Sequence, residues 1–474
     1  MGVSLANPFS RRSFLQTSAT AAASAGLYFS STAALTADEK SPNEQPNFGY
    51  IGTGIRFHTA LGPFSTELGP GLAVADVDAV QAGRAKQVIF DQHREFNRPL
   101  VVHTHEDYRH VLDNKEIDAV LIGSPDHWHT KHVVEAMQAG KDVYCEKPLT
   151  LTIKEGQQIL ETIKKTGQVL QVGTQQRTEF GQRFATAVAM MHDNRIGDVK
   201  KLTVAIGGSR DSGSMPVADP PQGLNWEKWL GQCPVVPYRE GKWVDTSGWG
   251  AGHPFSRAHR YYRWFYEYSG GKLTDWGAHH VDIAMWSIKK LTSDIGNIEI
   301  DPLSVVHPVE FKDGMPMQDD RFNCALKFNV KVTFKDGIEM FVTDNASDSL
   351  GFENGIMFEG SKGRFLVNRG KLVGKPVEQL KSNPLPGDWA DKLYGRPAPK
   401  SHMQHFVDCI KSRETPISDA ESHHRMLAVC HAINIAMRLN RKLTFDPATD
   451  KFVGDEQANS FIAREQRKGY EINV

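Results

Sequence analysis

The sequence predicts an α/β protein of two domains, a doubly wound parallel sheet followed by an α+β domain with a large, mostly antiparallel open sheet. Three observations support this fold class. The chain has 474 residues, which is long enough for two separate cores. Short apolar strands alternate with helices over residues 48–174, which is typical of a parallel sheet. Over residues 175–474 the strands become longer and alternate apolar with polar side chains, which indicates a sheet with one buried face.

The first 37 residues have the features of a twin-arginine export signal, and residues 38–47 those of a polar linker. The stretch "SRRSFLQ" precedes an uncharged run of small and apolar residues. An uncleaved membrane anchor is the alternative, but Ser and Thr interrupt the run, and a bilayer requires about 20 predominantly apolar residues. We expect cleavage near Ala34–Ala37 and a periplasmic or otherwise exported protein. Because this route carries folded proteins, the signal also predicts a cofactor that is bound before export.

Composition argues against several classes of protein. Acidic and basic residues nearly cancel to a formal charge of -1, and no long basic run is present, so the sequence gives no electrostatic basis for binding nucleic acid. Five cysteines are scattered without a CxxC pair, so neither a zinc ribbon nor a disulfide framework is predicted. We therefore expect a small molecule as the partner.

The stretch "NFGYIGTGIRF" combines a short apolar strand with a glycine turn. In a dinucleotide-binding fold of the Rossmann type, Gly52 would form the tight turn and Gly54 would let the backbone approach a pyrophosphate. Phe57 stands where the fingerprint normally has a third small residue, so a plain glycine turn is an equal alternative on this motif alone. The candidate cofactor-binding residues here are Gly52, Thr53, Gly54 and Ile55.

The second strand, within "GLAVADVD", ends at Asp76, whose carboxylate can accept hydrogen bonds from the adenosine ribose. A carboxylate at this position repels the additional 2'-phosphate of NADP, so we expect NAD. Arg84, a few residues further on, is the feature that leaves NADP as the less favoured alternative.

Two loops follow later strands of the predicted parallel sheet, "SPDHWH" from Ser124 and "EKP" from Glu146. Ligands bind doubly wound sheets beyond the carboxyl ends of the strands, so both loops are expected at one crevice. Helices are expected from His129 to Ala139 and from Ile153 to Thr166. His127 and His129 could position the nicotinamide or only cap the first of these helices. The further cofactor-binding candidates are Ser124, Pro125, His127, His129, Glu146, Lys147 and Gln175.

The second half is expected to place a folded, substrate-covering segment beside its sheet. Residues 207–268 are rich in Gly, Pro, Ser and Trp and are too long for a simple connector. Helices are expected over 181–193, 274–288, 400–412 and 421–439, followed by an irregular tail that wraps the body.

The stretch "TDWGAHHVD" contains two carboxylates and two imidazoles in nine residues. On a helix that starts near Asp275, the side chains of Asp275, His279 and Asp282 share one face. They could be ordinary core and helix-start residues, a metal site or a proton relay. No third or fourth ligand pattern such as HExxH is present, so no metal is expected.

The motifs "YIGTG", "SPDHWHTKHVVEAMQAGKDVYCEKPLT" and "GGKLTDWGAHHVD" together resemble the Gfo/Idh/MocA family of nicotinamide-dependent sugar and polyol oxidoreductases. The resemblance covers the chain from about Phe48 to the C-terminus. Through "LNWEKWLGQCP" and "GDEQAN" the sequence is also similar to a longer, exported branch of that family. The resemblance implies that His279 is the acid/base and that Lys147 and Asp275 complete the group that orients the alcohol.

Four residues are candidates for binding substrate: Arg177, Tyr262, Arg263 and His280. Arg177 could instead pair with a nearby acid such as Glu179, and aromatic residues at these spacings are more often in the core.

The predicted function is oxidation of a secondary alcohol of a sugar, polyol or glycoside with tightly held NAD. The periplasm has no free NADH pool, so the hydride has to be returned within one catalytic cycle. The alternatives are an NAD-dependent, redox-neutral glycosidase and a non-catalytic sugar-binding protein. The resemblance also implies that the related NAD-dependent glycosidases do not usually keep the lysine of "EKP", here Lys147, which favours the oxidoreductase. A dimer or tetramer is expected, because a large sheet with one exposed face favours association.

Overall fold

The computed structural model describes residues 45–98, 101–244, 254–291 and 294–474. The predicted export signal and most of the linker lie outside these residues. Among the helices in the described part of the chain, none is long and apolar enough to cross a membrane.

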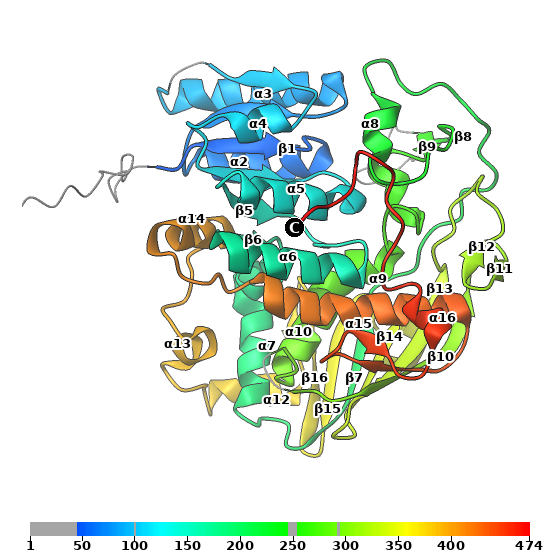
Figure 1. The fold of residues 1–474 in the computed structure, drawn as a ribbon. Helices are drawn as coiled ribbons and strands as arrows, with labels where there is room; N and C mark the ends of the chain where they lie inside the picture. Colours follow the sequence, from blue (N-terminus) through cyan, green and yellow to red (C-terminus); the bar gives the residue numbers. More distant parts are fainter. Residues whose placement is uncertain (1–44, 99–100, 245–253, 292–293) are drawn as a thin grey trace, which may run out of the picture. The chain divides into compact units, whose positions relative to one another are not determined.

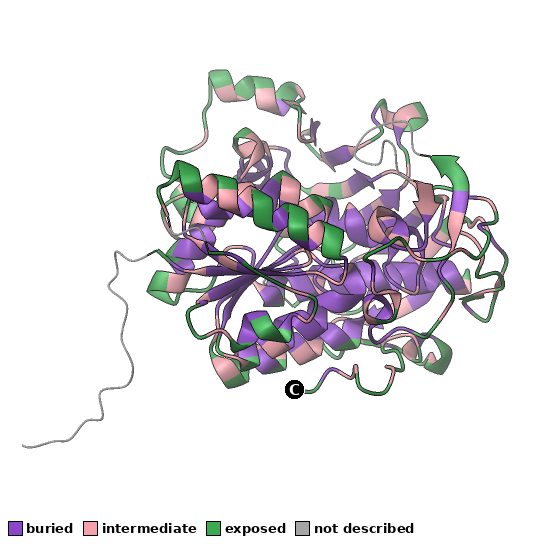
Figure 2. Ribbon diagram, turned by 90° about the horizontal axis from the view of Figure 1, so that it is seen from above, coloured by how far each residue is buried: buried purple, intermediate pink, exposed green. Residues whose placement is uncertain are grey.

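The first domain contains a parallel sheet of six strands in the order β3-β2-β1-β4-β5-β6 (Figure 1). Its central strands are buried along their whole length, because helices cover both faces (Figure 2). The doubly wound parallel sheet predicted from the sequence is therefore confirmed. The strands are β1 Phe48–Ile51, β2 Gly71–Ala75, β3 His103–His105, β4 Ala119–Ile122, β5 Asp142–Cys145 and β6 Leu170–Val172. The helical elements are η1 Phe57–Leu61, α2 Gly62–Thr66, α3 Ala79–Glu95, α4 Arg109–Asp113, α5 Asp126–Gln138 and α6 Ile153–Thr166.

Side-chain caps fix where two of these helices begin. The Asp78 carboxylate accepts hydrogen bonds from the first amides of α3. At α6, Thr152 and Glu155 form a reciprocal capping box, and Gly167 ends the helix in a left-handed conformation. These local signals account for the register of the strand-helix units that surround the crevice.

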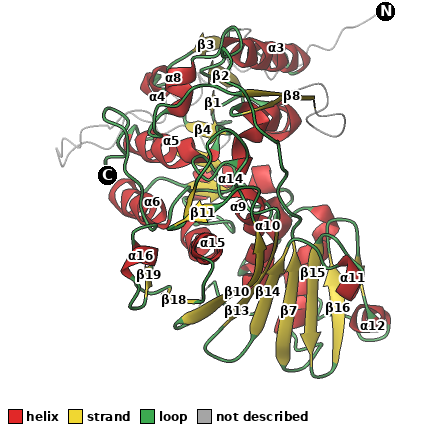
Figure 3. Ribbon diagram, turned by 90° about the vertical axis from the view of Figure 1, so that its right-hand side faces the viewer, coloured by secondary structure: helices red, strands yellow, loops and turns green. Residues whose placement is uncertain are grey.

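The second domain contains a sheet of nine strands in the order β17-β16-β15-β7-β14-β13-β10-β18-β19 (Figure 3). All neighbouring strands are antiparallel except β7 and β14, which are parallel, so the predicted large and mostly antiparallel sheet is confirmed. The strands are β7 Val199–Ala205, β10 Ile298–Val306, β13 Lys327–Thr333, β14 Glu339–Thr343, β15 Gly355–Gly360, β16 Gly363–Val367, β17 Leu372–Val373, β18 Leu443–Asp446 and β19 Lys451–Phe452.

Helices α7 Arg183–His192, α10 Gly277–Ser287 and α15 Ala420–Leu439 pack against the nine-stranded sheet. Helix α15 packs on α10 and β10 of the second domain and also on α6 of the first. One apolar core therefore continues from the parallel sheet into the antiparallel sheet. The remaining short elements are η2 Gln175–Arg177, η3 Phe180–Gln182, α9 Gly271–Asp275, β11 Phe311–Lys312, β12 Met315–Pro316, α11 Ser347–Leu350, α12 Lys375–Glu378, η6 Gln379–Lys381, α13 Trp389–Tyr394 and α16 Glu456–Asn459.

The described part of residues 207–268 folds beside the crevice around an aromatic cluster of its own. The cluster contains Trp229, Tyr238, Tyr261 and Phe265. The segment contains α8 Trp226–Leu230, β8 Glu240–Val244, β9 Pro254–Ser256 and η5 His259–Trp264.

The end of the chain returns to the first domain. Helix α14, His402–Ser412, places Phe406 against Tyr144 of β5, with ring centroids 5.7 Å apart, inside the core of the parallel sheet. The sequence boundary at residue 175 therefore does not separate two cores, because α14 supplies apolar side chains to the first. The tail then runs over α5 and α6, where Lys131 and Gln158 donate hydrogen bonds to the backbone oxygens of Glu471 and Ile472.

Candidate active site

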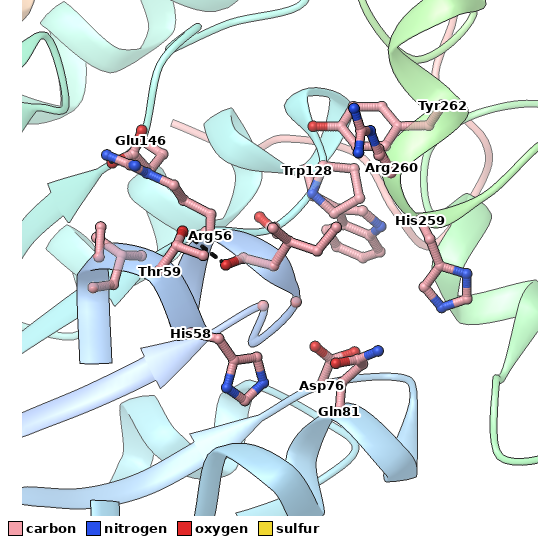
Figure 4. A pocket seen from close by; sticks show the side chains of 18 of the residues that line it. Arg56, His58, Thr59, Asp76, Gln81, Trp128, Glu146, His259, Arg260 and Tyr262 are labelled. Carbon is pink, nitrogen blue, oxygen red and sulfur yellow. Dashed lines mark hydrogen bonds and ion pairs between the residues drawn. The ribbon is translucent and has the colours of Figure 1, made fainter. Parts of the chain in front are cut away.

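The two domains and the described part of residues 207–268 line a pocket of about 1820 Å³. The ends of the parallel strands line one side, and η5, α9 and the start of α10 line the other. Figure 4 shows Arg56, Asp76 and Glu146 facing the pocket across from His259 and Tyr262. Drug-sized ligands occupy pockets of about 300–1,000 Å³, so this volume admits a dinucleotide together with a second ligand.

The glycine turn after β1 leaves room for a phosphate group. Gly52 has a φ of +77°, and a Cβ on it would lie 2.3 Å from the backbone nitrogen of Ser124. At Gly54, by contrast, a Cβ would meet no atom within 4 Å, so the backbone here is open to the pocket. A glycine backbone open to the pocket at the start of a helical segment fits the pyrophosphate of a dinucleotide.

The absence of a third glycine has a local structural consequence. Phe57 is fully buried, edge-on to Tyr50 with ring centroids 5.1 Å apart, and begins the π-helical turn η1. The wider turn accommodates the ring beside the first strand, where close helix packing would otherwise require a small residue.

Asp76 lines the pocket just after β2, and its carboxylate accepts hydrogen bonds from nearby residues. Its carboxylate accepts hydrogen bonds from the Thr53 backbone nitrogen at 2.7 Å, the Thr53 hydroxyl at 3.2 Å and the Asp78 backbone nitrogen at 2.9 Å. Burial raises the pKa of Asp76, and these hydrogen bonds oppose the shift. Thr53 itself does not line the pocket; it orients Asp76. Ile55 and Gln175, also predicted at the cofactor, do line it.

Glu146 follows β5 and is neutralised by a residue that the motif analysis missed. Arg56 Nη2 lies 2.7 Å from Glu146 Oε1, and Gln175 Nε2 donates to the same oxygen at 2.9 Å. The Glu146 side chain is only 5% exposed, so the ion pair compensates a carboxylate that would otherwise be buried alone.

The histidines after β4 hold loops together. Ser124, Pro125 and His129 line the pocket, and the two His129 ring nitrogens lie 2.6 Å from the Pro148 oxygen and 2.8 Å from the Ser124 oxygen. His129 thus ties the loop after β4 to the loop that carries Lys147. The prediction that His127 contacts the cofactor is not supported, because its ring is buried and directed away, with Nε2 donating to the Trp229 oxygen at 2.9 Å.

Lys147 and Asp275 meet across the pocket, from the first and second domains. Lys147 Nζ donates to Asp275 Oδ1 at 2.5 Å and to the Asp275 backbone oxygen at 3.2 Å, and the side chains are 16% and 12% exposed. Burial would raise the pKa of Asp275, but Lys147, Arg263 and Lys272 together hold it well below its ordinary value. Asp275 is therefore a carboxylate anion at neutral pH. The expected single helix is divided here: α9 ends at Asp275 and α10 begins at Gly277.

His279 lies one turn beyond Asp275, lines the pocket and is 4% exposed. Its Nδ1 is buried without a hydrogen-bond partner among the described residues. Burial lowers the pKa of His279 far below its ordinary value, and Lys147 and Arg369 lower it further. The imidazole is therefore neutral, with a ring nitrogen that can accept a proton.

Two residues that were predicted to bind substrate, Arg177 and His280, instead contact other residues in the interior of the protein. Arg177 forms a bidentate ion pair with Asp282 at 2.9 and 2.6 Å and does not line the pocket, because the buried carboxylate requires a counterion. His280 is fully buried and lies 2.9 Å from Asn354 Oδ1. Tyr262 and Arg263 do line the pocket: the Tyr262 hydroxyl donates to Asp126 at 2.8 Å, and Arg263 Nη1 lies 3.5 Å from Asp275 Oδ2.

Several pocket residues were not predicted from the sequence. Lys272 and Trp276 stand inside the stretch that contains Asp275, so their spacing on successive helical turns could have indicated them. Arg369 comes from the turn between β16 and β17, far away in the sequence, where no local motif marks it. Among the described residues, no group of three or more His, Cys, Asp or Glu could hold a metal ion, and all five cysteines are free and buried.

Comparison with known families identifies the class of protein. Residues 47–174 match the Gfo/Idh/MocA oxidoreductase family with its NAD-binding Rossmann fold, and residues 210–472 match its C-terminal alpha/beta domain. The chain belongs to this family, and NAD is its cofactor. The glycine turn, Asp76 and the pocket volume fit that cofactor.

Curated relatives have more than one activity. The chain is 34% identical over 147 residues to scyllo-inositol 2-dehydrogenase (NAD(+)) of Bacillus subtilis, covering 31% of this chain and 40% of that protein. It is 30% identical over 213 residues to a glycosyl hydrolase family 109 protein of Saccharopolyspora erythraea, covering 41% of this chain and 45% of that protein. Each match spans less than half of the relative.

Solved structures share the fold. WlbA dehydrogenase from Bordetella pertussis, in complex with NADH and UDP-GlcNAcA, has a TM-score of 0.55 at 15% identity, covering 84% of this chain and 98% of that chain. Aldose-aldose oxidoreductase from Caulobacter crescentus has a TM-score of 0.53 at 16% identity, covering 84% of this chain and 99% of that chain.

Proposed function

We propose that this protein oxidises a secondary alcohol of a sugar, polyol or glycoside with NAD. The observation that carries the proposal is the Lys147–Asp275 ion pair beside a neutral His279, in a pocket that admits a dinucleotide and a second ligand. Family membership supports oxidoreductase chemistry, and the named activity of the Bacillus subtilis relative supports a polyol or sugar as substrate.

Lys147, Asp275 and His279 have different roles in removing the proton from the alcohol. Lys147 donates a hydrogen bond to the hydroxyl oxygen, and Asp275 holds the ammonium in place at 2.5 Å. His279 is the group placed to accept the hydroxyl proton, because it lines the pocket and burial lowers its pKa, which keeps the imidazole neutral. NAD, when bound, accepts the hydride from the alcohol carbon. Tyr262 and Arg263 of η5 limit the space for the substrate on the same side of the pocket as Asp275 and His279.

We also propose that NAD stays bound through the catalytic cycle. Residues 1–37 carry the pattern of a twin-arginine signal, and an exported enzyme cannot draw on a cytoplasmic NADH pool. The hydride would then return to a second sugar or to the same substrate.

Redox-neutral cleavage of a glycoside is the second candidate. The similarity to a glycosyl hydrolase family 109 protein favours it. In this scheme the sugar is oxidised at carbon 3, the aglycone is eliminated, water adds, and the hydride returns. Lys147, which we would not expect in such glycosidases, favours the first candidate.

The test starts with dialysis of the purified protein, denaturation and mass spectrometry of any released nicotinamide. Near-stoichiometric NAD or NADH supports the retained cofactor, whereas an empty protein overturns it. The loaded protein is then given aryl glycosides, polyols and sugar pairs. Release of aglycone without net NADH supports the glycosidase. Reduction of bound NAD by an alcohol, with loss of this reaction in His279→Ala, supports the oxidoreductase.

A further inference from the structure

Positive charge is in excess on the substrate side of the pocket. The ammonium of Lys147 and the guanidinium of Arg263 approach the Asp275 carboxylate at 2.5 and 3.5 Å. Lys272 and Arg369 also line the pocket beside Asp275. Asp275 thus faces four cations, and its two oxygens are already engaged by the first two. Glu146, the other carboxylate that acts on Arg369, is paired with Arg56 at 2.7 Å.

Lys272 has no acidic partner within 4.0 Å among the described residues. Its ammonium lies 5.8 Å from the ring centroid of Trp264 and 5.7 Å from that of Trp276. Burial lowers the pKa of Lys272; attraction to Asp275 opposes this shift, and repulsion from Arg263 adds to it. The Lys272 ammonium therefore lies at the pocket wall beside two aromatic rings, with no carboxylate within 4.0 Å among the described residues.

Arg369 is a second pocket cation that packs against aromatic rings, and one of them is the same Trp276 ring. Its guanidinium lies 4.6 Å from the ring centroids of both Phe180 and Trp276. With the Gln176 amide turned so that its oxygen faces a donor, that oxygen accepts a hydrogen bond from Arg369 Nε at 3.1 Å and is a neutral partner. No carboxylate lies within 4.0 Å of its guanidinium in the described part of the chain.

We propose that the substrate carries an anionic group, a carboxylate or a phosphate, which binds between Lys272 and Arg369 beside Trp276. The inference rests on the proposed function and adds the charge of its substrate. A partly buried cation without a counterion is costly, and an anionic ligand removes that cost. The Lys272 ammonium and the planar Arg369 guanidinium are both groups that bind carboxylate or phosphate oxygens.

The cofactor's own phosphates are the competing explanation for these two charges. The glycine turn after β1, with Gly54 open to the pocket, accounts for the pyrophosphate. Arg56, the cation near that turn, is already paired with Glu146 at 2.7 Å. Lys272 lies instead against Gly207 and Trp264 of the second domain, where its Nζ would be 3.8 Å from a Cβ on Gly207. Lys272 is therefore on the side of the alcohol, and Arg369 approaches the same Trp276 ring as Lys272.

The experiment measures equilibrium binding to the full chain saturated with NAD, by calorimetry and thermal shift. The probes are D-glucose, D-glucuronate, D-glucose 6-phosphate and inorganic phosphate. We expect at least one anionic probe to bind about ten-fold or more tightly than glucose, and Lys272→Met and Arg369→Met to remove most of this preference. Preference for glucuronate identifies a carboxylate, and preference for the two phosphates identifies a phosphoryl group.

Matched variants separate local charge from general effects. Lys201→Met is the control, because Lys201 also lies over an aromatic ring, 4.8 Å from the Phe341 centroid, but outside the pocket lining. Arg369→Lys keeps the charge and should keep most of the preference. The proposal is overturned if no anion binds the wild type better than glucose, or if Lys272→Met weakens NAD as strongly as it weakens the anion. Because binding requires no hydride transfer, this failure is distinct from a failure of His279→Ala to abolish turnover.

Discussion

The two sides of the pocket differ in whether their charged side chains have partners within the protein. On the cofactor side, Glu146 is neutralised by Arg56, and Asp76 is surrounded by three hydrogen-bond donors from the chain. On the substrate side, Lys272 and Arg369 face the pocket without acidic partners in the described residues. Glu146 and Asp76 on the cofactor side thus have their partners within the protein. On the substrate side, a bound anionic ligand would supply the missing partner of Lys272 and Arg369.

The largest expected effect is that of acid, which should destabilise the whole fold and with it both sides of the pocket. Burial lowers the pKa of His127, His402 and His431 to about 3 and that of His280 to about 4. An unfolded histidine has a pKa of about 6.5, so the unfolded chain binds more protons between these values. The free energy of unfolding should therefore fall as pH drops from about 6.5 to 4, by up to about 1.4 kcal/mol per pH unit for each histidine. Urea unfolding across this range measures the slope.

The exposed His103 supplies the control for the acid experiment. His103→Ala should leave the pH profile unchanged, because this side chain is solvent-exposed in the fold. A stability that stays flat between pH 6.5 and 4 in the wild type would contradict the assignment of neutral, buried histidines.

His279→Ala should break only the substrate side. Loss of a general base lowers kcat by about 10²–10⁴-fold, while the affinity for NAD should stay within two-fold, roughly, because His279 lies beyond the glycine turn. Single-turnover reduction of bound NAD measures the first quantity, and titration of the stripped protein the second. His110→Ala, at an exposed position, is the control, and equal turnover in the two variants would remove His279 from the mechanism.

Lys147→Met tests how strongly the domains are joined through the site. Removing Lys147 deletes a short charged hydrogen bond but leaves Arg263 Nη1 3.5 Å from Asp275 Oδ2, so we expect a loss of about 1.5 kcal/mol, less than for a buried charge left alone. The double variant Lys147→Met with Asp275→Asn should recover part of this loss in urea unfolding. If the double variant is as unstable as the sum of the two single variants, the pair is not coupled.

Arg56→Ala sharpens the comparison from the cofactor side. Without Arg56 the buried Glu146 carboxylate repels the phosphates of NAD, so the Kd for NAD should rise about ten-fold, which corresponds to about 1.4 kcal/mol. Arg56→Ala combined with Glu146→Gln should restore most of the affinity in calorimetry. An unchanged Kd in the single variant would show that the pair does not serve the cofactor.

The sequence predicted best where contiguous residues carry the chemistry. Parallel strands place their following loops at one edge, so Gly54, Asp76 and Lys147 could be assigned to the crevice before the structure was known. The stretch around Asp275 and His279 could be assigned because helical spacing alone puts them together. For these positions, local geometry determines the location of the side chain.

The misplaced residues depend on contacts between distant segments. Arg177 forms an ion pair with Asp282, and His280 forms a hydrogen bond with Asn354. Neither partner is close in sequence. Arg369 reaches the pocket from the turn of a strand pair whose register no local pattern fixes. Tertiary packing decides each of these cases, and packing has no signature in the residues that flank them.

Helix α14 and the tail have a consequence for how the protein is made. The first domain obtains Phe406 and other core side chains from a segment near the end of the chain, and Lys131 and Gln158 bind the final residues. During synthesis the N-terminal domain therefore leaves the ribosome with an incomplete core, and contacts of very long sequence separation form last. The nucleotide-binding half would thus mature only after translation ends, and a fragment that stops at residue 174 should aggregate instead of folding alone.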